Sequence, residues 1–351
     1  MLSRRAVLVF LRTLALVTPM AVTVVARTTS TAAQGVMFSA GDAYERFMGR
    51  WSRELAPLLV KFAGIHDGDA VLDVGSGTGA LTAAVAVVAP SSRIIGIDPA
   101  APYVAFAQAR HPGDFIRFEV GDAQQLRFLD GSFDRTLSLL VLNFIPDPAK
   151  ALDQMIRVTK PGGTVAAAVW DYGEEMQMLR AFWDEAVALH PAAAARDERH
   201  MPLCRQGELG VLWRQYQLLD VWEKPLAIRT RFSTFDDYWS PFLDKQGPAG
   251  AYVAALAASE REQLRLRLRR RLLGEGPDRP FVLVARAWAV RGIVPSRAFR
   301  PMSVSALSHQ EGRSLHAIDK AATLKNWRRD ARVSVSSTPN LADADTSRRV
   351  P

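Results

Sequence analysis

Short apolar runs alternate with longer alanine-rich or amphipathic segments through the middle of the chain. The short runs cover residues 70–74, 93–97, 115–120, 133–144 and 164–170. Continuous apolar runs of this kind are typical of parallel strands buried on both faces. The alternation therefore predicts an α/β fold, a doubly wound and mostly parallel sheet with helices on both faces.

The segments between these runs predict helices over 80–88, 103–109 and 148–159. Pro99 fits the start of the helix over 103–109, because proline suits the first helical turn. Pro161-Gly162-Gly163 predicts a tight turn before the fifth strand.

Later in the chain the pattern predicts an amphipathic helix over 174–190, strands over 218–232 and 281–291, and a helical insertion between those strands. Ser259 and Glu262 have the spacing of a capping box at the start of the arginine-rich helix in this insertion. Its leucines, Leu264, Leu268 and Leu272, share one face, which leaves the arginines for solvent.

A glycine-rich turn follows the first predicted strand directly, in the sequence Asp73-Val-Gly75-Ser-Gly77-Thr-Gly79. Glycines allow positive φ and a close approach of backbone N–H groups to a ligand, and the following helix offers a positive N-terminus. The loop therefore predicts a site for a nucleotide-like ligand. The spacing Gly75-x-Gly77-x-x-Ala80 also satisfies the dinucleotide fingerprint, so NAD remains an alternative on this motif alone.

Two further acids follow predicted strands, Asp98 after the second and Asp122 after the third. Carboxyl ends of parallel strands meet at one edge of a sheet, which is where ligands of such folds bind. Asp98 is placed to accept both hydroxyls of an adenosine ribose. Either acid alone is also explained as a turn residue, whereas three acids at successive strand ends favour a site.

With these residues the chain resembles the S-adenosylmethionine (SAM)-dependent methyltransferases of the Rossmann-like class, of the ubiquinone/menaquinone-biosynthesis type (methyltransferase type 11). The turn at Lys160-Pro-Gly-Gly before the fifth strand strengthens the resemblance, because nicotinamide dehydrogenases do not usually share it. The resemblance implies a seven-stranded sheet with an antiparallel last strand, SAM as the cofactor, and the adenine near Asp122 and Ala123. The predicted cofactor-binding residues are Asp73, Gly75, Ser76, Gly77, Gly79, Asp98, Pro99, Asp122, Ala123 and Asn143.

The segment 43–59 has a helical apolar face that includes Tyr44, Phe47 and Trp51. Core packing explains this face. The resemblance implies instead that Tyr44 to Trp51 form a lid over the cofactor, and both interpretations stay open.

Aromatic residues are concentrated in the second half of the chain, where such enzymes carry their acceptor specificity. They could line an apolar acceptor pocket or simply fill the core. They are Trp170, Trp183, Trp213, Trp222, Trp239, Tyr238 and Phe242.

The sequence assigns no catalytic residue and no metal site. Methyl transfer from a sulfonium needs alignment and exclusion of water rather than a special nucleophile. If a base takes part, His200, Asp171 and Tyr172 are the nearest candidates by position, without a triad or metal-ligand spacing to support them.

The net charge of +8 over 351 residues is carried by the two ends of the chain. Residues 1–36 contribute +4 and residues 295–351 contribute +5, which leaves −1 for 37–294. A nearly neutral body argues against nucleic acid as a partner. The single cysteine, Cys204, excludes an intrachain disulfide and a multi-cysteine zinc site.

Residues 1–26 have the layout of a secretory signal, with Arg4 and Arg5 ahead of an apolar run too short for a stable membrane span. The alternative, which we favour, is a start upstream of the natural Met37 and a cytoplasmic protein. The predicted domain is 37–294, with a cofactor half over about 65–170 and an acceptor region over about 171–280. The composition of 295–351 predicts disorder.

The sequence thus predicts a SAM-dependent methyltransferase that transfers a methyl group to a small organic molecule by in-line displacement. The alternatives are a SAM- or SAH-binding module without turnover and, more remotely, an NAD(P)-dependent reductase. Neither the acceptor atom nor the oligomeric state follows from the sequence.

Overall fold

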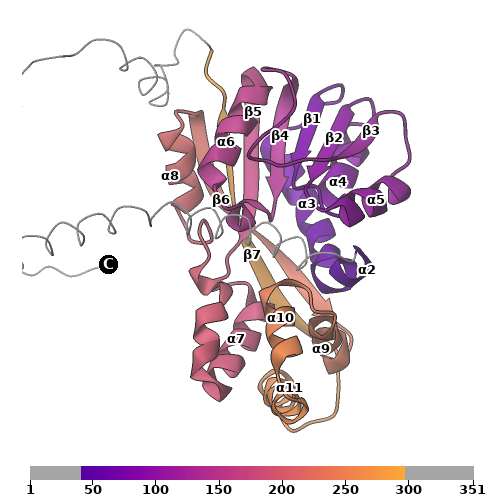
Figure 1. Cartoon of the computed structure of the whole chain (residues 1–351), viewed down its shortest axis with the longest axis vertical. Coiled ribbons are helices and arrows are strands. Elements are labelled where there is room, and N and C mark those ends of the chain that lie inside the picture. Colours follow the sequence, from indigo (N-terminus) through magenta and orange to yellow (C-terminus); the bar gives the residue numbers. More distant parts are fainter. Residues whose placement is uncertain (1–40, 297–351) are drawn as a thin grey trace, which may run out of the picture. The chain divides into compact units, whose positions relative to one another are not determined.

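Seven strands form one sheet in the order β3-β2-β1-β4-β5-β7-β6 (Figure 1). The computed structural model describes residues 41–296. Strands β1 to β5 pair in parallel, and β7 pairs antiparallel with both β5 and β6. The predicted α/β fold, its mostly parallel sheet and its antiparallel last strand are confirmed.

The strands begin and end close to the predicted runs, because those runs are the apolar positions that the helices bury. In β1 every residue after Ala70 is buried, and in β5 so is every residue from Gly163 to Trp170. The strands are β1 (Ala70–Val74), β2 (Arg93–Asp98), β3 (Ile116–Val120), β4 (Phe133–Leu139), β5 (Thr159–Trp170), β6 (Leu219–Phe232) and β7 (Phe281–Ile293).

Helices cover the sheet and also form a separate cluster beside it (Figure 1). Helix α3 packs across β4 to β7 and against α4, α6 packs on β4 and β5, and α8 packs on β6 and β7. Helices α7, α9, α10 and α11 pack on one another at one end of the sheet and include the predicted insertion. The α-helices are α2 (Gly41–Tyr44), α3 (Arg50–Ala63), α4 (Ala80–Val88), α5 (Ala101–Arg110), α6 (Pro148–Val158), α7 (Gln177–Leu189), α8 (Glu208–Gln215), α9 (Phe235–Leu243), α10 (Gly247–Ala255) and α11 (Ala258–Leu273). The other helical turns are η1 (Glu45–Gly49), η2 (Leu142–Phe144), η3 (Pro191–Arg196) and η4 (Glu198–His200).

The prediction of one strand over 133–144 was wrong in its second half. Strand β4 ends at Leu139, and Leu140 takes a left-handed conformation with φ of 64° while its N–H donates to the Ala168 carbonyl at 2.7 Å. The chain then turns into η2. After this exit, Val141 packs against Gly75 of the glycine loop. The residues after Leu139 are therefore apolar because they pack against the loop, although they are no longer part of the strand.

Pro161-Gly162-Gly163 is not a tight turn but an irregular part of β5. The pairing of β5 with β4 shifts register there, and Gly162 has φ of 78°. The Gly162 N–H donates to the Val294 carbonyl at 2.8 Å, and the Val294 N–H donates to the Gly163 carbonyl at 2.9 Å. The glycines therefore let the strand bulge and still satisfy its backbone by pairing with the end of β7.

Two predicted helix starts were also wrong. Pro102, rather than Pro99, lies in the first turn of α5, because Ala100 is the residue that precedes the helix. Helix α11 begins after Ala257, whose N–H donates to the Glu260 carboxylate at 2.9 Å. Ser259 lies inside the helix and is not its cap.

The helix predicted over 43–59 is longer, running from α2 through the π-helical η1 to Ala63 in α3. It ends where Gly64 takes φ of 68°. Within residues 41–296, no helix combines the length and apolar character needed to cross a bilayer. The predictions for 1–36 and for the tail lie outside the described residues, except for Pro295 and Ser296.

Candidate cofactor and acceptor cavity

A cavity of about 380 Å³ opens at the carboxyl ends of β1, β2, β4 and β5. This is the edge of the sheet at which the sequence predicted a ligand. Eight of the ten predicted cofactor residues line it, namely Asp73, Gly75, Ser76, Gly77, Asp98, Pro99, Asp122 and Ala123.

The glycine loop is held against β2 by its own backbone. The N–H groups of Gly75 and Ser76 both donate to the Ile97 carbonyl at 2.8 Å. Gly75 has φ of 76°, and a Cβ built on it would lie 2.5 Å from a Val141 methyl group. Only glycine meets both conditions, so this position is required by the close approach of η2 to the loop.

Asp73 is fully buried at the end of β1 and is only half satisfied. Its Oδ2 accepts hydrogen bonds from the Thr82 N–H at 3.1 Å and the Thr82 hydroxyl at 2.7 Å. Its Oδ1 has no hydrogen-bond partner. Burial raises the pKa of Asp73 to about 7, against the lowering effect of the Thr82 bonds, and the Asp98 charge adds to the rise. The buried Oδ1 therefore remains available to accept from a donor of a bound ligand.

Asp98, at the end of β2, joins the loop to the next helix. Its Oδ2 accepts from the Gly77 N–H at 3.0 Å, and its Oδ1 accepts from the Ala100 N–H at 2.9 Å. Burial raises the pKa of this carboxyl, while the two backbone bonds oppose the rise. A carboxylate oxygen accepts more than one hydrogen bond, so both oxygens remain able to accept from a ligand.

Asp122 differs from the other two acids because it is exposed. Its Oδ1 accepts from the Gln124 N–H at 2.8 Å, which closes a turn after β3. Ala123 beside it is buried. The turn interpretation of Asp122 is confirmed, and its role in binding a ligand stays a prediction.

Gly79 and Asn143 are the two predicted residues that do not line the cavity. Gly79 has φ of 90° and precedes α4, and a Cβ there would lie 2.8 Å from the His111 ring. Asn143 is buried in η2, where its amide donates to the Met201 sulfur at 3.3 Å. Both shape the surroundings of the site.

The match to known proteins falls on the same part of the chain. Residues 72–167 match the family model of a methyltransferase domain. Over this segment the chain is similar to methyltransferase domains. It contains β1 to most of β5, and so every strand end that carries a predicted cofactor residue.

Two curated relatives resemble the chain. An uncharacterized protein of Mycobacterium tuberculosis is 29% identical over 170 residues, which is 47% of this chain and 62% of that protein. The ubiquinone/menaquinone biosynthesis C-methyltransferase of Bdellovibrio bacteriovorus is 37% identical over 118 residues, which is 33% of this chain and 49% of that protein. The matches therefore span about half to three fifths of the relatives' length. Among solved structures, the YcgJ protein of Bacillus subtilis is 20% identical, with a TM-score of 0.47 over 68% of this chain and 98% of that one.

The helix that precedes the methyltransferase domain contributes one wall of the cavity. Tyr44, Phe47 and Met48 line it. The Tyr44 hydroxyl is hydrogen-bonded to the Ser52 hydroxyl at 3.2 Å, and its ring lies 5.5 Å from the Tyr103 ring. Tyr44 to Trp51 thus cover the site while packing into the core, so the two interpretations of this segment are compatible. Whether it opens as a lid stays a prediction.

The aromatic residues after the methyltransferase domain mostly fill the core. Among the five tryptophans proposed for the pocket, Trp170 alone lines the cavity. Trp183, Trp213 and Trp239 are buried elsewhere, and Trp222 is 64% exposed. Tyr238 and Phe242 are buried among α7 and α9. For these residues the pocket interpretation was wrong, because the helical cluster needs its own core.

Of the three candidate bases, only Tyr172 lines the cavity. Burial raises the pKa of its hydroxyl well above the ordinary value, which prevents it from acting as a base near neutral pH. The Oδ2 atom of Asp171 accepts hydrogen bonds from Arg286, from Nε at 2.8 Å and from Nη2 at 2.5 Å. His200 is exposed. Within residues 41–296 no cluster of His, Cys, Asp and Glu is arranged to hold a metal ion.

Sequence reasoning missed Glu198, which lines the cavity and is buried. It stands in the run Asp197-Glu198-Arg199-His200, whose charge is typical of an exposed loop. No periodicity distinguishes this acid from its neighbours. Its burial depends on tertiary contacts with α7.

Proposed function

We propose that this protein is a SAM-dependent methyltransferase that moves a methyl group to a small organic acceptor by in-line displacement. The observation that carries the proposal is the buried Asp73, whose Oδ1 lacks a partner at the wall of a cavity bounded by the glycine loop. An unpaired buried carboxylate is costly unless a ligand compensates it. The ammonium of the methionine portion of SAM supplies that compensation.

The other residues of the site suit the remaining parts of the cofactor. Ser76 has a buried hydroxyl without a partner and lines the cavity, where it would donate to the carboxylate of the methionine portion. Asp98 would accept from the ribose hydroxyls. Asp122 and the Ala123 N–H would meet the adenine, as the family resemblance implies. The donors and acceptors that line the cavity thus fit SAM from one end to the other.

SAM supplies a methyl group that is already electrophilic, so the task of this chain is to bind, align and exclude water. Phe47, Met48 and Phe144 give the cavity an apolar wall. The fingerprint spacing of the glycine loop also suits a nicotinamide dinucleotide, but the match of residues 72–167 to a methyltransferase domain favours SAM over NAD.

The test is methyl transfer from tritium-labelled SAM to a metabolite extract by the full chain, with native mass spectrometry of the purified protein in parallel. We expect co-purified SAM or SAH and a labelled small-molecule product. Asp73→Asn should abolish both, and Asp67→Asn, which removes a carboxylate outside the cavity, should retain both. Cofactor binding with no labelled product from any extract would support the binding module instead.

A further inference from the structure

Glu198 is a buried carboxyl at the part of the cavity formed by the end of β5 and by α7. Its side chain is 3% exposed, and Trp170, Tyr172 and Leu179 line the same cavity. Among the described residues its hydrogen-bond donor is Trp183, whose indole Nε1 donates to Oε2. These residues follow the strand ends that hold the proposed cofactor site, in the region where the sequence places acceptor specificity.

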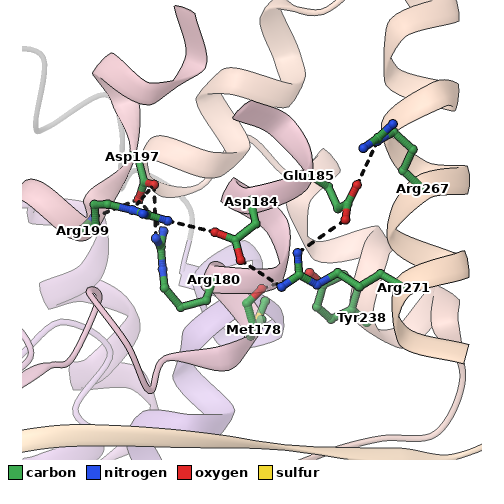
Figure 2. Close-up of polar contacts among 9 residues, drawn as sticks. All are labelled: Met178, Arg180, Asp184, Glu185, Asp197, Arg199, Tyr238, Arg267 and Arg271. Atoms are coloured by element: carbon green, nitrogen blue, oxygen red, sulfur yellow. Dashed lines mark hydrogen bonds and ion pairs between the residues drawn. The ribbon is translucent and has the colours of Figure 1, made fainter. Parts of the chain in front are cut away.

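Asp197 and Arg199, the chain neighbours of Glu198, form ion pairs that join this segment to α7 (Figure 2). Arg180 of α7 binds both oxygens of the buried Asp197. Arg199 binds the same carboxylate at 2.7 Å and also Asp184 of α7 at 2.8 Å. The two neighbours of Glu198 are thereby tied to the helix that carries Trp183. A network of this kind fixes a side chain without filling the cavity.

The charge of the cavity restricts the acceptor. Among the described residues that line it, the ionisable carboxyls are Asp73, Asp98, Asp122 and Glu198, and there is no Lys, Arg or His. An anionic acceptor would meet like charge with nothing to neutralise it. The remaining wall near Glu198 is aromatic and aliphatic, which suits an apolar molecule.

We propose that Glu198 accepts the proton that the methyl acceptor loses, and that this acceptor is an uncharged apolar molecule with an O–H or N–H group. The inference rests on the proposed methyl transfer. The acceptor oxygen or nitrogen forms a bond to the methyl carbon while the carbon–sulfur bond breaks, and that electron pair stays on sulfur as a neutral thioether. The acceptor proton passes to the Glu198 carboxylate and from there to water, so charge and atoms balance.

The protonation behaviour of Glu198 agrees with this role. Burial raises its pKa to about 7, and the Asp197 charge adds to the rise. The Trp183 hydrogen bond and the Arg180 charge oppose it. The Glu198 charge in turn contributes to the raised pKa of the Tyr172 hydroxyl. A base that titrates near neutral pH can both take up a proton and release it during turnover.

Acceptor binding can be measured without turnover, on the full chain saturated with SAH. The probes are 2-naphthol, 2-naphthylamine and 2-naphthoate, which share one apolar ring system and differ in the polar group. We expect the two uncharged probes to bind at least about 10-fold more tightly than 2-naphthoate, because Glu198 repels the carboxylate. In Glu198→Gln this preference should shrink several-fold, since glutamine keeps an acceptor for Trp183 and loses the charge. Glu54→Gln, an exposed change of equal charge on α3, should leave the preference unaltered.

The pH dependence separates charge from shape. In the wild type the preference against 2-naphthoate should be larger at ~pH 8.5 than at ~pH 5.5. In Glu198→Gln this dependence should be smaller, and what remains belongs to Asp73, whose pKa is about 7 and which lines the same cavity. Equal binding of all three probes, tighter binding of 2-naphthoate, or no binding of the uncharged pair to the SAH complex overturns the proposal. Where the wild type methylates either uncharged probe, Glu198→Gln should lower kcat by about 100-fold or more while SAM affinity stays the same. If the wild type does not bind SAM at all, the proposed function itself is overturned.

Discussion

Thr78 in the glycine loop donates its hydroxyl hydrogen to Glu45 Oε1 at 2.5 Å. The same Glu45 carboxylate pairs with Arg53 of α3 and, at 3.3 Å, with Arg110 of α5. One carboxylate thus joins the helix that covers the cavity to the loop that forms its floor. The order of the loop and the position of the cover are coupled through this contact.

Thr78→Val keeps the shape of the side chain and removes its hydrogen bond to Glu45. We expect a loss of about 1–3 kcal/mol in the free energy of unfolding, the range for hydrogen bonds to charged groups. SAM affinity should also fall, because the loop loses its tie to the cover. Thr78→Ser retains the hydroxyl and is the matched control. Urea unfolding and calorimetric titration measure the two effects, and equal behaviour of the two variants would contradict the coupling.

Asp98→Ala removes an acceptor for the ribose hydroxyls and for two backbone N–H groups. We expect SAM to bind about 10- to 100-fold more weakly, because the charge-assisted bonds lost with this carboxylate contribute roughly 1.5–3 kcal/mol in total. Asp69→Ala, outside the cavity, is a control for loss of a carboxylate. A folded Asp98→Ala variant with unchanged SAM affinity would remove Asp98 from the site.

The raised pKa of Asp73 makes cofactor affinity depend on pH. The SAM ammonium attracts the carboxylate and not the neutral acid, so affinity should be steady just above about pH 7 and fall as pH drops below it. Titration of a single group can change the SAM affinity by at most about 10-fold per pH unit. Titration between ~pH 5.5 and ~7.5 measures the slope, and Asp73→Asn should reduce it. A flat profile in the wild type would mean that Asp73 does not meet a cation.

The raised pKa of Asp73 also affects the stability of the cofactor-free protein, but there a rise in pH is unfavourable. Asp73 titrates near 3.8 when unfolded and at about 7 when folded, so the folded state holds more protons between these values. The free energy of unfolding should therefore decrease as pH rises through this window, as far as Asp73 contributes. Asp73→Asn should flatten this part of the curve in urea unfolding.

The ion pairs of Figure 2 should differ in how much each contributes to the free energy of unfolding. Arg180→Gln leaves the buried Asp197 with one cation fewer and should destabilise the protein by about 3 kcal/mol. Arg271→Gln breaks ion pairs with Asp184 and Glu185, but the Arg271 side chain is 39% exposed, so we expect less than about 1 kcal/mol. Urea unfolding decides, and equal losses would contradict the assignment of the buried pair as the anchor.

The sequence predicted the strands that hold the cofactor because these depend on local pattern. Asp73 and Asp98 lie at the ends of the apolar strands β1 and β2, and Asp122 follows β3, in which apolar residues alternate with Arg117 and Glu119. Parallel pairing brings these three ends to one edge of the sheet. The starts of α5 and α11 escaped prediction because competing start signals lie next to each other in the sequence. Pro99 stands close to Pro102, which lies in the first turn of α5, and the Ser259–Glu262 spacing competes with Glu260, which caps the N–H of Ala257. The exit from β4 escaped it because Leu140 carries no sign of its left-handed backbone.

The acceptor side could not be predicted in the same way. Glu198 becomes a cavity residue only because Arg180 and Arg199 hold its neighbour Asp197 against α7. On α11 the arginines were predicted to face solvent, and Arg267 and Arg271 are exposed, but they also bind Glu185 and Asp184 of α7, which the sequence did not predict. These contacts join residues that are far apart in the sequence, and tertiary packing determines which of them meet.

The most direct test of the central claim is calorimetric titration of the full chain with SAM, SAH and NADH under one set of conditions. We predict saturable binding of SAM and SAH at one molecule per chain, greatly weakened by Asp73→Asn, and no measurable binding of NADH. Binding of NADH in place of SAM, or SAM binding that is indifferent to Asp73, would contradict the assignment of this cavity to a methyl-donating cofactor.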